Sequence, residues 1–154
     1  MSGYEILRFA HIVGAIAWLG SGIGLLVLSL QFTAAEDHDG LLAVLRRSDA
    51  LGKVLFMPAA LVTVGAGVTL VATEAAFGFG DLWILIGFGG ILASGVAQMA
   101  VAAPAGQRFA DLAEAGGADR VGMAAAARRM NLGNALDAAV LLLVVWAMVA
   151  KPVL

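Results

Sequence analysis

The sequence contains no cysteine and little charge, and these two absences narrow the functions open to it. Without cysteine, the chain has no disulfides, thiolate metal sites, iron–sulfur clusters or cysteine nucleophiles. Charged residues make up 13% of the chain, the formal net charge is −2, and no basic tract favours nucleic acid. The motifs HExxH and GxSxG, which mark zinc proteases and serine hydrolases, are also missing. We therefore set aside thiol-dependent, hydrolytic and nucleic-acid-binding functions.

Apolar residues are abundant: they make up 62% of the 154 residues, and the mean hydropathy is +0.97. Such a composition is typical of an integral membrane protein. The 20 glycines agree with this, because small residues let membrane helices approach closely. The N-terminus, MSGYEILRFAH, lacks the basic leader and the small-residue cleavage site of a signal peptide. We therefore expect the first apolar stretch to remain in the protein.

Four apolar runs are long enough to cross about 30 Å of hydrocarbon at a helical rise of about 1.5 Å per residue. They cover residues 6–32, 54–72, 82–103 and 131–150. A lipid-exposed backbone must satisfy its own hydrogen bonds, and no alternating pattern indicates a barrel. The predicted fold is an all-α, integral membrane four-helix bundle, with 1–154 as a single transmembrane domain.

The distribution of lysine and arginine predicts the orientation of the bundle. The first and third connections hold seven of the nine basic residues. We therefore expect a multi-pass protein of the bacterial cytoplasmic (inner) membrane, with both termini on the outer, periplasmic side. The seven are Arg46, Arg47, Lys53, Arg108, Arg120, Arg128 and Arg129, against Arg8 and Lys151 on the other side.

Both connections on the basic side contain helical patterns. Residues 34–53 begin with the polar AEDHDG and continue with leucines at helical spacing. This pattern predicts either a short amphipathic helix on the inner membrane surface or a plain helical linker. The other connection stays polar after Pro104 and becomes alanine-rich from Asp119. Because alanine is the best helix former, we expect the fourth helix to begin near Asp119, before it enters the membrane.

Small side chains follow helical spacing in the first span and so form one smooth face for a neighbouring helix. The third span has a similar side at Gly87, Gly90 and Ser94. Packing is the ordinary role of such faces, and we predict a homo-oligomer through them, with a further membrane protein as another possible partner. The face of the first span comprises Ala10, Gly14, Ala17 and Ser21, with Gly20 and Gly24 beside it.

The first span also contains a histidine, His11, where an ionisable side chain is costly. Arg8 lies one turn away, and the topology brings Lys151 to the same level, with Met148 one turn below it. These residues suit a b-type haem or porphyrin: a histidine ligand to iron, two cations for the propionates, and a methionine as second ligand. Alternatively, His11 bonds a backbone carbonyl and the cations reach the interface. The only other histidine, His38, lies in an acidic loop on the opposite side, too far to share an iron.

A polar inner cluster is predicted in the other half of the membrane. Asn134 and Asp137 lie on the fourth span, and Gln98 on the third reaches a similar depth. As the one carboxylate well inside a span, Asp137 is a functional candidate that would relay a proton. The alternatives are a hydrogen-bonded clasp with Gln98 and Asn134, or a pair with Arg108 or Arg129 at the inner surface.

Nearly the whole chain resembles a bacterial family of predicted four-span integral membrane proteins of unknown function. The resemblance rests on HIVGAIAWLGSGIG, FMPAALVTVGAGVTL, GFGDLWILIG and VVWAMVAKP. More distantly, the chain is similar to the four-span, haem-binding HemJ-type protoporphyrinogen oxidase family. Members of that family carry a histidine followed by a tryptophan–glycine pattern in the first span and a terminal Lys-Pro. The matching residues here are His11, Trp18, Lys151 and Pro152.

The HemJ-type pattern is incomplete in this chain. That family has a Pro-Arg pair and a second histidine at the inner end of its first span, where this sequence reads LLVLSLQF, and its third-span lysine is replaced by LWILIGFGG. The resemblance therefore implies an outer His–Lys site more than the oxidase activity itself. Two hypotheses follow: a haem- or porphyrin-binding redox protein with its site at His11, or a non-catalytic membrane subunit or small transporter component that depends on Asp137.

Overall fold

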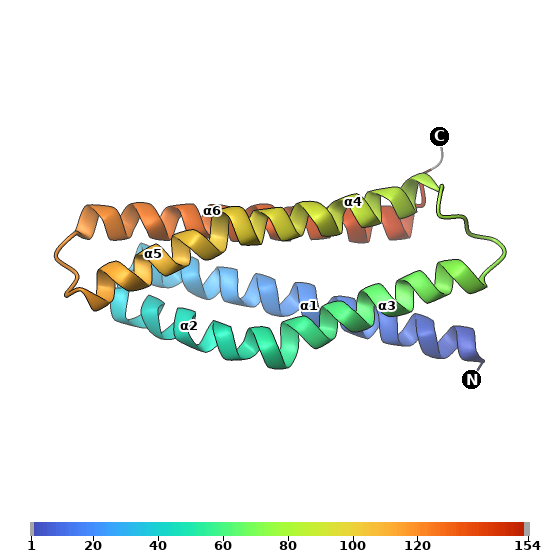
Figure 1. The fold of residues 1–154 in the computed structure, drawn as a ribbon, viewed down its shortest axis with the longest axis horizontal. Helices are drawn as coiled ribbons and strands as arrows, with labels where there is room; N and C mark the ends of the chain where they lie inside the picture. Colours follow the sequence, from blue (N-terminus) through green and yellow to red (C-terminus); the bar gives the residue numbers. More distant parts are fainter. Residues whose placement is uncertain (1, 153–154) are drawn as a thin grey trace.

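The computed structural model describes residues 2–152, except for the side chain of Asp49, and these residues form a bundle of four long helical rods (Figure 1). Both chain ends and the connection 74–81 lie at one end, here called the terminal end. The connections 35–37 and 115–119 lie at the opposite, far end. The elements are α1 (Gly3–Ala34), α2 (His38–Leu51), η1 (Gly52–Phe56), α3 (Met57–Thr73), α4 (Leu82–Val96), η2 (Ala97–Ala102), α5 (Ala103–Glu114) and α6 (Arg120–Ala150).

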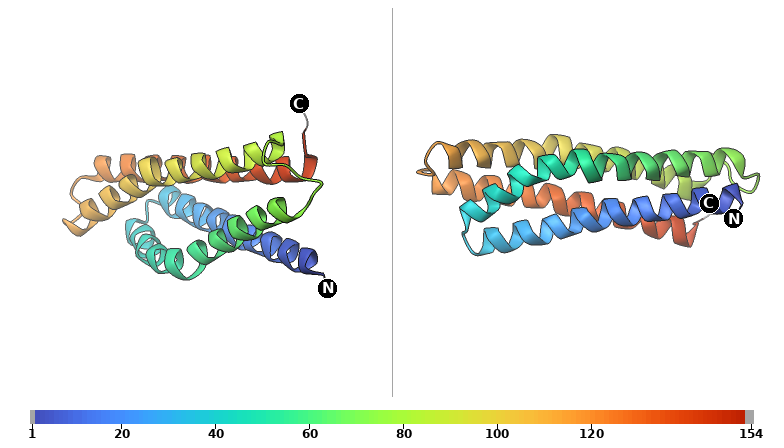
Figure 2. Two further views of the ribbon diagram at one scale, coloured as in Figure 1. Left: turned by 45° about the vertical axis from the view of Figure 1, so that its right-hand side comes forward. Right: turned by 90° about the horizontal axis from the view of Figure 1, so that it is seen from below.

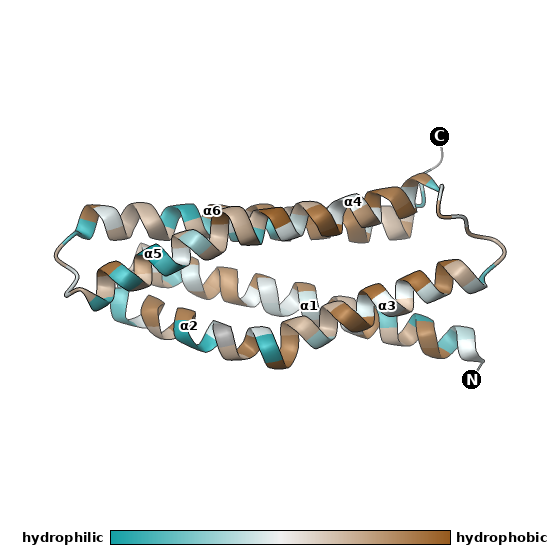
Figure 3. Ribbon diagram, viewed as in Figure 1, coloured by the Kyte–Doolittle hydropathy of each residue, from teal (hydrophilic) through white to brown (hydrophobic). Residues whose placement is uncertain are grey.

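Four continuous helices are long and apolar enough to cross a membrane, which confirms the predicted all-α bundle. Each of them contains one of the four apolar runs found in the sequence. Large apolar side chains of these helices stay exposed, for example Leu92 at 73% and Val149 at 80%, as expected of surfaces that face lipid. Hydrophilic positions gather at the far end, in α2, α5 and the start of α6 (Figure 3).

Local sequence signals set the helix ends. Ser2 and Glu5 form a reciprocal capping box at the start of α1. Asp119 accepts a hydrogen bond from the Gly122 amide at 2.8 Å, so α6 begins where the alanine-rich sequence predicts it. At its other end Lys151 adopts a left-handed conformation, with φ 44°, and stops α6 just before a proline.

The second and third rods each contain a π-helical segment followed by a proline. η1 joins α2 to α3, with Pro58 just after it, and η2 joins α4 to α5, with Pro104 just after it. A proline has no N–H to donate within a helix, and the wider π turn before it accommodates the missing bond. The rods therefore continue through both prolines, well beyond the apolar runs.

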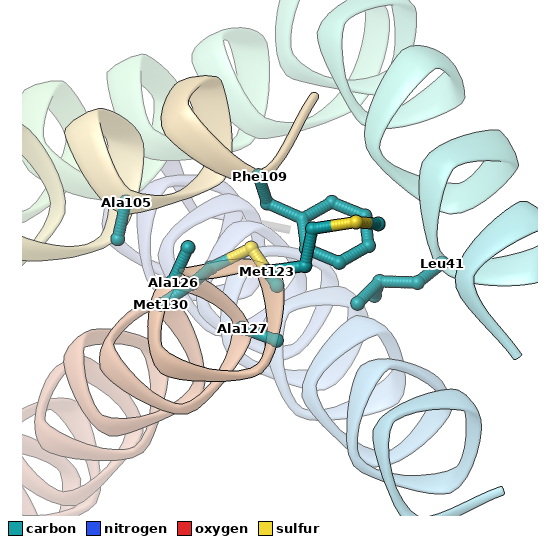
Figure 4. Close-up of a cluster of buried hydrophobic side chains, with 7 residues drawn as sticks. All are labelled: Leu41, Ala105, Phe109, Met123, Ala126, Ala127 and Met130. Atoms are coloured by element: carbon teal, nitrogen blue, oxygen red, sulfur yellow. The ribbon is translucent and has the colours of Figure 1, made fainter. Parts of the chain in front are cut away.

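The main hydrophobic core lies at the far end, outside the apolar runs (Figure 4). Leu41 of α2 is 1% exposed and Phe109 of α5 is 0% exposed, and both belong to one buried cluster with residues of α6. The first connection is thus a helix whose apolar face packs on the protein, not on the membrane surface. α5 was not predicted from the sequence. The core comprises Leu41, Ala105, Phe109, Met123, Ala126, Ala127 and Met130.

The rods are arranged in an arc in the order α3, α1, α6 and α4 (Figure 2). α1 packs along α3, α4 packs along α6, and α1 contacts α6, whereas α3 touches neither α4 nor α6 within the described residues. Glycines allow these contacts: a Cβ at Gly14 would meet the Ala59 carbonyl at 3.1 Å. Gly20 and Gly24, in contrast, have open space around them. Self-association through that surface stays a prediction.

Candidate functional site

A cavity of about 740 Å³ lies inside the arc of helices and is the candidate functional site. Residues of α1, α2, α4, α5, α6 and both π segments line it, and none of the described residues of α3 does so. Its size suits a small-molecule site, for which about 300–1,000 Å³ is usual. Much of the wall is apolar, including Trp18, Phe56 and Leu141, and one side is polar.

Asp137 provides the charge on the polar side of the cavity. It lies 13 residues before the end of α6 at Ala150, about 20 Å from the terminal end at the usual helical rise. One carboxylate oxygen accepts a hydrogen bond from the Ser94 hydroxyl, and the other accepts one from Gln98 Nε2 at 2.9 Å. Two donors from the third rod, one on α4 and one on η2, therefore hold this carboxylate in place.

The structure brings together all three residues of the polar inner cluster predicted from the sequence. Gln98 Nε2 lies 3.2 Å from Asn134 Oδ1 and also donates to Asp137. The expected alternative of an arginine partner is not seen: the one ion pair among the side chains that the structure describes does not involve Asp137, and Arg108 and Arg129 are exposed. The cluster thus joins η2 to α6 through uncharged donors.

A neighbouring polar contact between α1 and α6 was missed by sequence reasoning. Buried Ser29 donates to Asn131 Oδ1 at 2.5 Å, and Asn131 Nδ2 donates to Thr33 at 3.0 Å. Three residues turn a helix by about 300°, which is about 60° short of a full turn. Asn131 precedes Asp137 by six residues, so the two side chains point about 120° apart, and Asn131 faces α1. The signal in the sequence was a serine and a threonine one turn apart at the end of an apolar run.

An ion pair stands at the solvent-exposed edge of the cavity. Arg46 of α2 and Glu114 of α5 both line the cavity and lie 2.8 Å apart, with side chains 63% and 55% exposed. The pair links α2, which follows the connection 35–37, to α5, which precedes the connection 115–119. Since both groups are largely solvated, we expect the pair to contribute little to the free energy of unfolding.

The two π segments also border the cavity. Phe56 comes from η1, and Gln98 and Ala102 come from η2. π-helical turns occur frequently at functional sites, because the extra residue re-aims side chains relative to the helix on either side. In this protein η2 contains Gln98, the residue that donates a hydrogen bond to Asp137.

His11 lies outside the cavity, on the contact between α1 and α3. Its Nδ1 is 2.7 Å from the Thr63 carbonyl oxygen. A carbonyl only accepts, so Nδ1 carries the proton and Nε2 is left as the second ring nitrogen. A Cβ at Gly67 would lie 3.0 Å from the ring, which shows how closely the imidazole packs on α3. The backbone-bonded alternative for His11 is therefore what the structure contains.

Of the other residues of the predicted haem site, Arg8 lies on α1 with His11, whereas Met148 and Lys151 lie at the end of α6. Met148 packs toward Gly87, and the Lys151 ammonium lies 4.5 Å from the Phe77 ring centroid, both in the part of the bundle formed by α4 and α6. The half of α1 nearer the terminal end, which contains the exposed Arg8, is separated from the end of α6 in Figure 1 and in the left view of Figure 2. His11 alone fits a haem ligand, because its backbone bond orients the ring; Met148 and Lys151 do not accompany it.

The acidic loop before α2 is used for capping. Asp37 accepts a hydrogen bond from the Gly40 amide at 2.8 Å, and His38 Nδ1 lies 3.2 Å from an Arg120 nitrogen. His38 also stacks on Phe109, with ring centroids 6.0 Å apart. Within the described part of the chain, no group of three or more histidine or acidic side chains is placed to hold a metal ion.

Comparison with known proteins identifies one sequence family. Residues 5–152 match the family described as "Predicted integral membrane protein (DUF2269)". Neither the curated proteins nor the solved structures gave a match. The resemblance to a four-span membrane family of unknown function is thereby confirmed, and the more distant similarity to HemJ-type oxidases stays a prediction.

Proposed function

Because this chain belongs to the DUF2269 family of predicted integral membrane proteins, we propose that it binds a small solute in a cavity within the bilayer, as a component of the transporter class. The observation that carries the proposal is the position of Asp137 on the wall of the 740 Å³ cavity. An ionisable side chain inside a membrane helix is costly and usually marks a substrate or ion pathway. A purely structural clasp would need no adjoining space for a ligand.

The orientation of the cavity follows from the charge distribution. α2, η1, α5 and the first turns of α6 contain seven of the nine basic residues, so the far end is the cytoplasmic end under the positive-inside rule. Both termini then face the periplasm of a bacterial inner membrane. The exposed edge of the cavity at Arg46 and Glu114 opens toward the cytoplasm.

Single-cysteine labelling tests this proposal. Because the sequence contains no native cysteine, the introduced thiol is the only one in the chain that can react. Ala138 lines the cavity, whereas the adjacent Ala139 is exposed on the outside of the bundle. A thiol must ionise in water to react, so a charged, membrane-impermeant methanethiosulfonate should label Ala138→Cys and leave Ala139→Cys largely unmodified. Labelling should occur in inside-out vesicles and not in right-side-out vesicles.

Two results would contradict the proposal. Failure of Ala138→Cys to react in vesicles of either orientation means that water does not reach the cavity. Equal reaction of Ala138→Cys and Ala139→Cys means that the wall of the cavity is not distinguished from the lipid-facing surface. Reaction in right-side-out vesicles only would reverse the proposed orientation.

A second candidate function is haem or porphyrin binding at His11. The supporting observation is the hydrogen bond from Nδ1 to the Thr63 carbonyl, which is the arrangement that orients a histidine to ligate a metal through Nε2. A bound haem would supply one-electron redox chemistry. An absorption spectrum of the protein purified after haem supplementation tests this: a Soret band that His11→Ala abolishes supports the site, and no band, or an unchanged one, rejects it.

A further inference from the structure

The wall of the cavity contains a carboxyl group with no basic partner, which narrows the class of solute that the cavity can hold. Among the described side chains, three ionisable ones line the cavity: Arg46, Glu114 and Asp137. The first two pair with each other at 2.8 Å on the exposed edge. Among residues 2–152, no basic side chain forms an ion pair with Asp137. Once the pair of Arg46 and Glu114 is set aside, the carboxyl group of Asp137 is the ionisable group that remains on the described part of the wall.

The contacts of Asp137 are uncharged. A serine hydroxyl and a glutamine amide donate one hydrogen bond to each carboxylate oxygen. An ionised carboxylate offers about four acceptor positions, so about half remain for a ligand. Neutral donors orient a carboxylate without neutralising it, and in a low-dielectric site an opposite charge on the ligand has a larger effect than it has in water.

The apolar part of the wall favours an apolar body beside that carboxylate. Trp18, Ile23 and Phe56 line the cavity together with Leu141. Apolar walls gain from burying hydrocarbon, and the face of an indole ring attracts a cation within about 6 Å. The described residues contain no group of three or more acidic or histidine side chains that could hold a metal ion, and Asp137 is the one carboxylate at this part of the described wall.

We propose that the cavity binds a lipophilic organic monocation, with its charge at Asp137 and its apolar substituents against the aromatic wall. This inference rests on the proposed solute-binding function and adds the class of solute. It predicts selection by charge between molecules of equal size. The volume of about 740 Å³ admits a drug-sized cation.

Two probes of nearly equal shape and opposite charge test the proposal. Radiolabelled tetraphenylphosphonium is measured by equilibrium dialysis on the full chain in lipid nanodiscs, with empty nanodiscs as background. Tetraphenylphosphonium should bind, and radiolabelled tetraphenylborate, measured in a separate dialysis because the two ions precipitate together, should bind more weakly by about tenfold or more, the loss expected when a contact to a charged group is removed. Asp137→Asn should lower the affinity for tetraphenylphosphonium by a similar factor, and Asp137→Glu should restore most of it.

Asp111→Asn is the matched control, since it makes the same substitution at an exposed position of α5 that does not line the cavity. A solvated carboxylate outside the cavity is largely screened, so the affinity should change by less than about twofold. Equal affinity for tetraphenylborate, or unchanged binding of tetraphenylphosphonium in Asp137→Asn, overturns the cation assignment. Selectivity in the wild-type protein decides the matter even if Asp137→Asn does not fold.

Failure of this inference is distinguishable from failure of the proposed function. If Ala138→Cys is labelled but the two probes bind with equal affinity, the cavity takes up solutes without selecting a cation. If Ala138→Cys is not labelled and neither probe binds, the solute-binding function itself is rejected.

Discussion

Gly133 provides the sharpest test of how the third rod packs on the fourth. A Cβ at Gly133 would lie 2.7 Å from the Ala102 backbone nitrogen, 2.9 Å from its Cβ and 3.0 Å from its Cα. These atoms belong to η2, and two of them are backbone, so no rotamer change relieves the contact. Ordinary contact begins at 3.4 Å, so α6 and η2 must separate by 0.7 Å, the difference between 3.4 and 2.7.

The expected magnitude follows from comparison with a glycine that has free space. Nothing lies within 4 Å of a Cβ at Gly89, which is exposed in the middle of α4. Both substitutions to alanine gain the same helix propensity, up to about 1 kcal/mol, whereas overpacking against η2 costs about 1–3 kcal/mol. Gly133→Ala should therefore have a free energy of unfolding about 1–3 kcal/mol lower than that of Gly89→Ala.

The assay is reversible unfolding in mixed micelles. Tryptophan fluorescence is followed as the mole fraction of sodium dodecyl sulfate rises, and the transition is extrapolated linearly for the wild type and both variants. Equal stability of the two alanine variants, or a more stable Gly133→Ala, would refute the close backbone approach of α6 and η2.

Three further contacts elsewhere in the bundle can be tested by substitution with the same assay. Ser29→Ala removes the buried donor to Asn131 and should lower the free energy of unfolding by about 1–2 kcal/mol, whereas Ser21→Ala, whose hydroxyl bonds only carbonyls of its own helix, should change it by less than about 0.5 kcal/mol. A loss as large in the second variant would refute the interhelical contact. Lys151→Met removes an ammonium that lies over two aromatic rings and should cost about 0.5–1 kcal/mol, with Lys151→Arg closer to the wild type; equal stability of the two would argue against this contact. Arg46→Ala should change stability by less than about 1 kcal/mol, because its ion pair is exposed, and a larger effect would show that the pair fastens the far end.

Part of the fold outside the apolar runs was predictable in principle. The start of α6 at Arg120 was read correctly, because the Asp119 cap and the alanine-rich run are local signals. α5 was missed because its overall composition is polar, although Ala105, Phe109 and Leu112 repeat at helical spacing and pack in the core. The continuation of the rods through Pro58 and Pro104 was not readable, since π turns have no clear sequence signature.

The candidate site was likewise predictable from the sequence only in part. The depth of Asp137, Asn134 and Gln98 follows from their distance along apolar helices, and that was sufficient to group them. Their bonding to one another depends on α4 and η2 packing against α6. The expected group of His11 and Lys151 relied on level alone, and level does not determine which helices are neighbours.

Composition and run length by themselves determined that this chain is an all-helical membrane protein with four crossings. These are additive, local properties: the cost of a polar backbone in lipid requires helices, and the length of each apolar run sets its span. Only the tertiary structure decided which faces meet. Close approach at glycines paired α1 with α3 and α4 with α6, which placed His11 against Thr63 and left a cavity beside Asp137. Such pairing depends on contacts between residues far apart in the sequence, where no local pattern specifies the partner.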